Sequence, residues 1–339
     1  MKIRQTRSTD SSSRALLQDN HARPITYLRL AITDRCNLRC IYCRPEKGVP
    51  FVPHEEILSY EELERLTAIF CTLGISKVRI TGGEPFARKG CLALLERLKA
   101  MEGVRSLHIT TNGIEIAPYL DALAELGISS INLSLDTLDR QRFRQITRRD
   151  HLDDVLRTMH GIIERRIPLK INSVVLADTR DEEIVSLAAL AREAALTVRF
   201  IEKMPFSGMA RPAKLVNGYL LQRLEGIFPA MEECTQEESS TSRVFSLAGY
   251  RGKIGIIQGH SRLFCSTCNK VRIAPEGILK TCLYDNGVLD LKKMLRQGAG
   301  DREIHAAIHR SIRKRFLNGY EAEQQARQGP EPSMCRIGG

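Results

Sequence analysis

LRLAITDRCNLRCIYC, residues 28–43, joins a strand pattern to a group of three cysteines. Its first half belongs to the apolar, β-branched run 27–33, which is typical of a buried strand. Its second half places Cys36, Cys40 and Cys43 in a C-x3-C-x2-C pattern. Three cysteines at one fixed spacing arise by chance in roughly 1% of chains of such composition. The pattern therefore indicates a thiolate site at the carboxyl end of a strand.

Five further apolar runs follow along the chain and alternate with segments of helical periodicity. These runs are residues 77–83, 107–113, 131–136, 170–176 and 198–204. Strands that alternate with helices predict parallel β/α units. Six such units in about 180 residues are too few for a complete eight-stranded barrel. We therefore expect an α/β fold, a partial (open) TIM-type (β/α)6 barrel.

Two capping signatures place helix starts between these strands. Ser59 with Glu62 forms a capping-box pattern before an apolar helical stripe. Thr179 with Glu182 repeats the pattern before the helix that follows the fifth run.

Polar residues gather where the predicted strands end. They are Gly82-Gly83-Glu84, Thr110-Thr111-Asn112, Ser134, Asp136 and Glu202. Barrels of parallel strands carry their active sites at the carboxyl ends of the strands. We therefore expect the site at this edge.

Composition divides the chain into three parts and limits its class. We expect a mobile tail over 1–24, the barrel over 25–205, and a C-terminal region over 206–339. No stretch approaches the roughly 20 apolar residues of a membrane span, and a signal peptide pattern is absent, so we expect a cytoplasmic protein without membrane contact. The net charge is +11, but aromatic residues make up only 5% and Trp is absent, which argues against nucleic-acid binding. We read the basic run Arg310, Arg313, Lys314 and Arg315 as a solvated helix face.

Ten cysteines in such a chain favour metal binding or catalysis over disulfides. Structural zinc sites use four ligands, whereas three thiolates in one loop can hold three irons of a [4Fe–4S] cluster. The fourth iron of the cluster would then stay open to a small molecule. We expect such a cluster at Cys36, Cys40 and Cys43.

A second group, Cys265, Cys268 and Cys282, has the spacing C-x2-C-x13-C. It fits a zinc knuckle with His260 or Cys234 as the fourth ligand. It also fits a second iron–sulfur cluster with an open iron, the hypothesis we favour.

The first cysteine group resembles that of the radical S-adenosylmethionine (SAM) superfamily, because Tyr42 precedes its last cysteine and Gly82-Gly83-Glu84-Pro85 matches the GGE motif. The second group and the terminal Gly338-Gly339 extend the resemblance over residues 25–339 to the GTP 3′,8-cyclase family, lyases of molybdenum cofactor biosynthesis. The resemblance implies two [4Fe–4S] clusters, SAM as cosubstrate and GTP as substrate, with no catalytic residue beyond clusters and SAM.

The resemblance also implies binding residues. For SAM they are Tyr42, Gly83, Ser134 and Met204. For GTP they are Arg29, Arg79, Thr110, Lys170, Lys270 and Arg272, with Lys77 and Arg199 as neighbours. Gly338 and Gly339 would reach into the active site, although small residues at a chain end also fit a frayed terminus.

Partners and departures complete these expectations. The resemblance implies an electron donor, a downstream cyclic pyranopterin monophosphate synthase and, in many relatives, a homodimer. Lys270 replaces an arginine of the family pattern, Arg148 replaces a glycine, and Cys335 is an additional thiol open to oxidation. The departures leave room for an alternative, a divergent radical SAM enzyme with an auxiliary cluster that acts on a peptide or another substrate.

Overall fold

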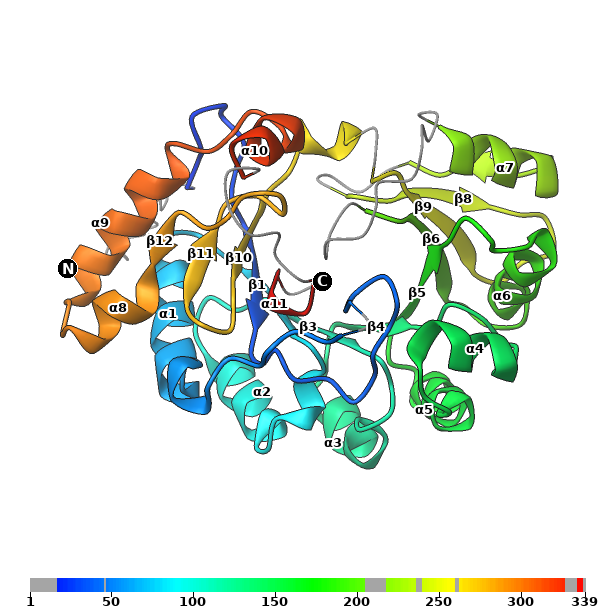
Figure 1. The fold of residues 1–339 in the computed structure, drawn as a ribbon, viewed down its shortest axis with the longest axis horizontal. Helices are drawn as coiled ribbons and strands as arrows, with labels where there is room; N and C mark the ends of the chain where they lie inside the picture. The colour runs from blue at the N-terminus through cyan, green and yellow to red at the C-terminus, as the bar shows by residue number, and fades with distance from the viewer. Residues whose placement is uncertain are drawn as a thin grey trace, which may run out of the picture.

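The computed structural model describes residues 17–45, 47–204, 218–235, 240–259, 262–326 and 334–337. One curved sheet organises them, with the strand order β12-β11-β10-β1-β2-β3-β4-β5-β6-β9-β8-β7. The strands surround a central opening, and helices α1 to α6 cover the outer face (Figure 1). In this part of the chain β12 and β7 are the two edges of the sheet, so the barrel is open, as predicted.

Six parallel β/α units form the centre of the sheet, which confirms the predicted fold class. Their strands are β1 (Tyr27–Ala31), β2 (Lys77–Thr81), β3 (Ser106–Thr111), β4 (Ser130–Ser134), β5 (Leu169–Val175) and β6 (Thr197–Glu202). Their helices are α1 (Tyr60–Thr72), α2 (Cys91–Ala100), α3 (Leu120–Glu125), α4 (Arg140–Thr147), α5 (Leu152–Glu164) and α6 (Asp181–Glu193). Every predicted strand overlaps an observed one, and the apolar runs end in loops that lead to the site.

The C-terminal region adds strands to both edges of this central sheet. β9 (Lys253–Ile257) pairs in parallel with β6, and β10 (Lys270–Ile273) pairs in parallel with β1. Antiparallel strands then extend each edge: β8 (Arg243–Ser246) and β7 (Glu232–Glu233) beyond β9, and β11 (Ile278–Lys280) and β12 (Leu289–Asp290) beyond β10. The described part of residues 206–339 therefore contributes to the same sheet and shares its core.

Five further helices complete the described C-terminal region: α7 (Tyr219–Ile227), α8 (Leu291–Arg296), α9 (Asp301–Ile312), α10 (Gly319–Ala326) and α11 (Met334–Ile337). The short α11 lies within the central opening (Figure 1). Ile337 is buried there in a small cluster with Tyr284 and Ala322. The short helix α11 is thus held inside the curve of the sheet.

One capping prediction is confirmed and the other is displaced by one residue. Ser59 caps α1 in a capping box with Glu62. Before α6, however, the carboxylate of Glu183 accepts the Arg180 amide at 3.0 Å, and Thr179 instead accepts the amide of Leu176. Glu183 is buried and also accepts the Thr137 hydroxyl, so a tertiary contact fixes where this helix begins.

The predicted mobile tail is wrong for residues 17–24, and residues 1–16 lie outside the described part. Leu17 packs into the main core with 3% of its surface exposed. Gln18 and Pro24 form an isolated β-bridge, and between them Asp19 pairs with Arg23 at 2.6 Å. The charged residues of this segment form buried ion pairs. Local composition alone does not distinguish such residues from charged residues exposed to solvent.

Among the described residues, no helix is both long and apolar enough to cross a membrane.

Candidate active site

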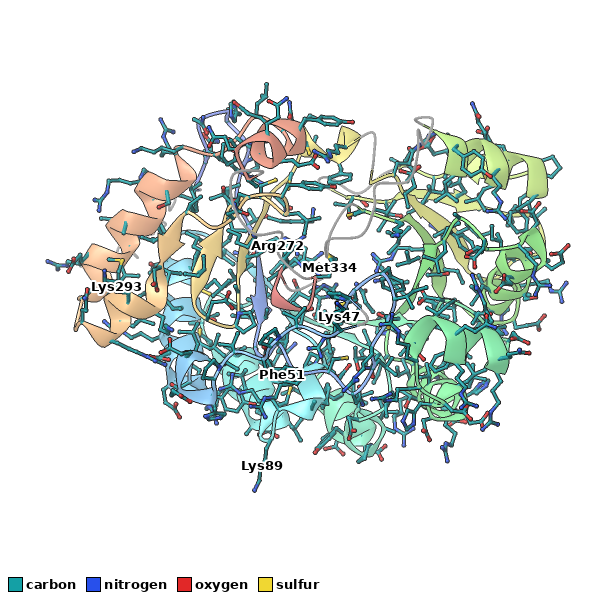
Figure 2. The ribbon with its side chains drawn as sticks, viewed as in Figure 1. Lys47, Phe51, Lys89, Arg272, Lys293 and Met334 are labelled. Carbon is teal, nitrogen blue, oxygen red and sulfur yellow. The ribbon has the colours of Figure 1, made fainter. Side chains whose placement is uncertain are left out.

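A cavity of about 300 Å³ lies at the carboxyl ends of β1 to β6, the edge at which the sequence predicts the site. Most of the polar residues expected there line it, including Thr110, Asn112, Ser134, Asp136 and Glu202. Met334 of α11 closes one part of its wall, and Figure 2 shows Met334 and Arg272 near the centre of the molecule.

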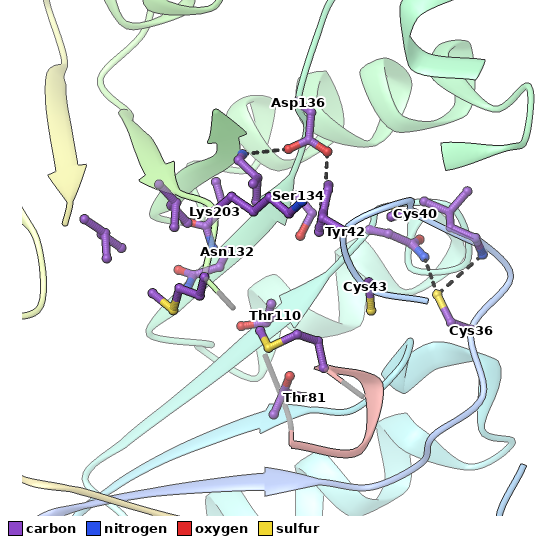
Figure 3. Close-up of a pocket in the computed structure, with 18 of the residues that line it drawn as sticks. Cys36, Cys40, Tyr42, Cys43, Thr81, Thr110, Asn132, Ser134, Asp136 and Lys203 are labelled. Atoms are coloured by element: carbon purple, nitrogen blue, oxygen red, sulfur yellow. Dashed lines mark hydrogen bonds between the residues drawn. The ribbon is translucent and has the colours of Figure 1, made fainter. Parts of the chain in front are cut away.

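The first cysteine loop follows β1 and presents all three thiols to this cavity (Figure 3). Two N–H groups donate to the Cys36 sulfur. They are the side-chain amide of Asn112 at 3.5 Å and the backbone amide of Leu38 at 3.4 Å. Burial raises the pKa of Cys36 to about 11 and that of Cys40 well above its ordinary range. Thiols in such surroundings ionise when a metal centre supplies positive charge.

The loop backbone is tied to α4. The amide of Arg39 donates to the Thr147 carbonyl at 3.0 Å, and the amide of Ile41 donates to the Ile146 carbonyl at 2.9 Å. Arg148, the residue after α4, adopts a left-handed φ of 57° and donates to the carbonyls of Arg39 and Arg44. Glycine adopts that conformation without strain, and glycine is the residue that the resembled family pattern has at this position.

Tyr42 anchors the same loop to the strands across the cavity. Its hydroxyl donates to Asp136 at 2.7 Å, and the second oxygen of Asp136 accepts the amide of Val174 at 2.8 Å (Figure 3). Burial raises the pKa of Asp136 to about 6, although the Val174 amide and the Tyr42 hydroxyl oppose this shift. The contact fixes the aromatic ring beside the thiols.

The Gly82-Gly83-Glu84 segment packs against the first cysteine loop. A Cβ at Gly83 would lie 2.3 Å from the carbonyl oxygen of Arg35, so this close approach requires glycine. Glu84 is fully buried and accepts hydrogen bonds from the Thr111 hydroxyl and the Asn112 amide at 2.8 and 2.7 Å. Burial raises the pKa of Glu84 to about 7. Glu84 therefore joins two strand ends beneath the cavity.

The structure brings all four predicted SAM residues to the wall of one cavity: Tyr42, Gly83, Ser134 and Met204. Among the described residues, no three Cys, His, Asp or Glu side chains are grouped to hold one metal ion. A [4Fe–4S] cluster binds each thiolate at a different iron, so its ligands stand at separate corners. Three thiols on one cavity wall fit that chemistry.

The predicted GTP residues fall into two sets. Arg29, Thr110, Arg199 and Arg272 line the main cavity. Arg79 is buried behind them, where its guanidinium donates to the Tyr27 hydroxyl at 2.6 Å and the Ile109 carbonyl at 2.8 Å.

The three predicted lysines also lie outside the main cavity wall. The ammonium of Lys77 lies 5.0 Å from the centre of the Tyr27 ring. Lys270 lines the neighbouring cavity, and Lys170 is half-buried on β5 opposite Asn132 in register.

Several cations share this low-dielectric region. Burial and neighbouring arginines lower the pKa of Arg29 to about 9 and that of Arg199 to about 10. Three buried polar atoms on the wall have no hydrogen-bond partner in the described structure: Arg199 Nε, Asn132 Oδ1 and Asn172 Oδ1. A ligand that carries both anionic acceptors and polar donors would satisfy all three.

Sequence reasoning missed Tyr27, Asn132, Asn172 and Lys203. The last three line the main cavity, and Tyr27 lies among the cations with 5% of its surface exposed. Burial raises the pKa of Tyr27, but Arg79 and Arg29 lower it by more, to about 7. Strand register would have pointed to Tyr27, because on the neighbouring strands it lies opposite two predicted GTP residues, Lys77 and Lys270.

The second cysteine group lines a smaller, adjacent cavity. Cys265, Cys268 and Cys282 lie on its wall, and Arg272 belongs to the walls of both cavities. Burial raises the pKa of Cys282 to about 11 and that of Cys265 above its usual value. For Cys268, burial also raises the pKa, but Arg315 and Lys270 lower it by more, to about 7.

The structure gives no support to Cys234 as a fourth ligand. Cys234 follows β7 at the opposite edge of the sheet from β10 and β11, and it is absent from the lining of this cavity. The other predicted fourth ligand, His260, lies outside the described residues.

Family models match nearly the whole of this architecture. Residues 30–191 match the radical SAM superfamily, and residues 196–319 match the family described as Molybdenum Cofactor Synthesis C. A GTP 3′,8-cyclase of Moorella thermoacetica is 39% identical over 330 residues, which cover 95% of this chain and 100% of that protein. The chain belongs to the GTP 3′,8-cyclase family. Iron–sulfur clusters and SAM are the cofactors of this family.

Other relatives differ in length. A GTP 3′,8-cyclase of Thermodesulfovibrio yellowstonii is 40% identical, over 87% of this chain and 93% of that protein. Molybdenum cofactor biosynthesis protein 1 of Homo sapiens is also 40% identical, but this chain spans only 48% of its length. The Streptococcus suis SuiB structure bound to S-adenosylmethionine has a TM-score of 0.59 at 17% identity, covering 86% of this chain and 68% of that one. That likeness concerns the fold alone.

Proposed function

We propose that this protein converts GTP to (8S)-3′,8-cyclo-7,8-dihydroguanosine 5′-triphosphate, as a GTP 3′,8-cyclase. The observation that carries the proposal is a single cavity lined by three thiols, the four predicted SAM residues and three of the arginines predicted for GTP. The adjoining cavity with the second thiol group supports the same conclusion. The relatives favour this activity over the peptide-modifying alternative.

The first thiol group would hold a [4Fe–4S] cluster, and the second group would hold another. When bound, the first cluster would supply the electron for cleavage of SAM, the source of the radical that removes the C3′ hydrogen of GTP. Bond formation between C3′ and C8 would then require one further electron, from the electron donor, and one proton at the guanine ring. The chain positions these reactants and excludes water. Tyr42, pinned by Asp136, would hold the SAM side of the cavity beside Gly83, Ser134 and Met204.

Arg29, Arg199 and Arg272 would bind the triphosphate directly. Their mutual proximity costs free energy that an anionic ligand would recover. Arg79 would act behind them through Tyr27 and Thr110, to which its guanidinium donates at 2.6 and 3.4 Å.

We assign supporting roles to the lysines and to the chain end. Lys77, Lys170 and Lys270 would add positive charge around the triphosphate. Gly338 and Gly339 lie outside the described residues, but Met334 on the cavity wall and buried Ile337 support their predicted place in the active site. A homodimer, an electron donor and a downstream cyclic pyranopterin monophosphate synthase remain predictions.

The test is anaerobic turnover with reconstituted protein. SAM, a reductant and GTP are added, and 5′-deoxyadenosine and isomers of GTP are followed by liquid chromatography and mass spectrometry. We expect GTP-dependent deoxyadenosine in a matching amount with one GTP isomer. Deoxyadenosine without any change in GTP would overturn the cyclase proposal and leave a radical SAM enzyme of another substrate.

A further inference from the structure

Three buried charged side chains brace the second thiol loop, and two of them, Arg23 and Arg315, line its cavity. Asp19, Arg23 and Arg315 are 1%, 6% and 4% exposed. One oxygen of Asp19 accepts from Arg23 at 2.6 Å and from Arg315 at 3.4 Å. One carboxylate thus fixes two guanidiniums that come from opposite ends of the chain.

Both guanidiniums reach the Cys265–Cys268 loop. Arg23 donates to the carbonyl of Cys265 at 2.8 Å. Arg315 donates to the carbonyl of Cys268 at 2.7 Å and, through its other terminal nitrogen, to the Cys268 sulfur at 3.0 Å. The fork of a single arginine therefore holds both the backbone and the sulfur of one predicted iron ligand.

Fold stability alone does not explain this arrangement. Burying several charges costs desolvation energy that ion pairing recovers only in part, so such networks are weak evidence for stability. The neighbouring arginine of the same basic run, Arg313, is exposed and makes no comparable contact to the loop in the described structure. Within this basic run only Arg315 is buried, and its guanidinium donates to the Cys268 sulfur.

We propose that Arg315 is a positioning residue that tunes the second cluster through its hydrogen bond to Cys268, with Asp19 and Arg23 holding it in place. The inference rests on the proposed function, because it requires a cluster at this site. Hydrogen bonds to the sulfur ligands are one of the means by which proteins set the potential of such clusters. A cationic donor at the sulfur stabilises the additional negative charge of the reduced state, so Arg315 raises the midpoint potential.

The test measures the midpoint potential of the second cluster by an EPR-monitored redox titration. The full-length chain carries Cys36→Ala, Cys40→Ala and Cys43→Ala, so that only the second site loads iron. In this background Arg315→Met is compared with the matched control Arg313→Met. We expect Arg315→Met to disfavour reduction about tenfold, a shift of about 59 mV to more negative potential for a one-electron couple.

Arg315→Lys keeps the positive charge but loses the paired N–H donors of the guanidinium. It keeps the test valid if the methionine variant does not fold. We expect it to retain the cluster with a smaller shift of the same sign, and to lose the exchangeable-proton coupling that the arginine donor gives in ENDOR spectra. Potentials and couplings in both Arg315 variants that equal those of Arg313→Met would overturn the inference while the proposed function stands. A parent protein that binds no cluster at this site would refute both.

Discussion

Arg148 occupies a position at which the resembled family pattern has glycine. Its backbone is strained there, but its side chain makes hydrogen bonds that glycine cannot make. Its φ of 57° is strained for an L-residue by about 1 kcal/mol, whereas its guanidinium donates to two carbonyls of the first cysteine loop. The side chain thus adds a hold on the loop that a glycine lacks.

We predict that Arg148→Gly changes the free energy of unfolding by less than about 1 kcal/mol, because relieved strain offsets the lost hydrogen bonds. The loop should nevertheless hold its cluster less firmly. Iron release to a chelator, measured with the second cysteine group replaced by alanine, should accelerate several-fold. Arg149→Ala, at an exposed neighbour, is the control. Equal release rates in all three proteins would contradict this account of Arg148.

Tyr27 gives a pH dependence with a definite sign. The pKa of its phenol is about 7 in the folded protein, because Arg79 and Arg29 outweigh burial, and about 10 in the unfolded chain. Between pH 7 and 10 the unfolded state therefore binds the additional proton, and stability rises with pH over this window. Below pH 7 the contribution is absent.

We predict that the stability difference between the apoprotein and its Tyr27→Phe variant widens between pH 7 and pH 9, by at most about 1.4 kcal/mol per pH unit. Urea unfolding at the two pH values measures it. Tyr119→Phe, at a phenol that is 38% exposed, is the matched control. A difference for Tyr27→Phe that is constant with pH would show that the phenol stays protonated.

Single residues also show which parts of the site could be predicted from the sequence. The grouping of the six clustered cysteines could be predicted from their spacing and from the strand ends. The four residues expected to bind SAM came from the family resemblance, and they line the same cavity as the first group. Arg315 was assigned to a solvated face, and this was wrong for a physical reason. The partner that buries it, Asp19, lies 296 residues away in a segment whose polarity suggested a mobile tail.

At the scale of elements, the six strands could be predicted because buried parallel strands form apolar runs between helical stripes. The ends of these elements depend on tertiary contacts, as the start of α6 at Asp181 shows, because buried Glu183 displaces it by one residue. The pairing of β9 and β10 with the barrel could not be predicted, since no local pattern records which strand a distant segment joins.

The two cysteine groups belong to different elements, so their loss should have different effects. We predict that Cys36→Ala abolishes SAM cleavage, because the first cluster would hold SAM beside Tyr42 and Gly83. Cys268→Ala should retain uncoupled deoxyadenosine formation but yield no GTP isomer. Cys71→Ala, at a buried cysteine outside both groups, should retain both products. Full isomer yield from Cys268→Ala would refute the role of the second group.

At the scale of the whole molecule, the sheet is assembled from both halves of the sequence. β10 covers the edge of β1 and β9 covers the edge of β6, so the central six strands have no free edge only when the late strands are in place. Unpaired strand edges are templates for aggregation. We predict that residues 17–205 expressed alone are insoluble or self-associated, whereas the full chain is not. Sedimentation of the two proteins measures this, and a monomeric fragment would contradict it.

The same topology has a consequence for biosynthesis on the ribosome. The first strand to emerge pairs early with β2 on one side, but its partner on the other side, β10, is translated more than 200 residues later. During that interval the nascent chain exposes a strand edge and incomplete thiol sites, the state in which chains are vulnerable to misassembly. Cys282 is translated after β10, so the second thiol group is complete only once the strand that closes this edge has been made.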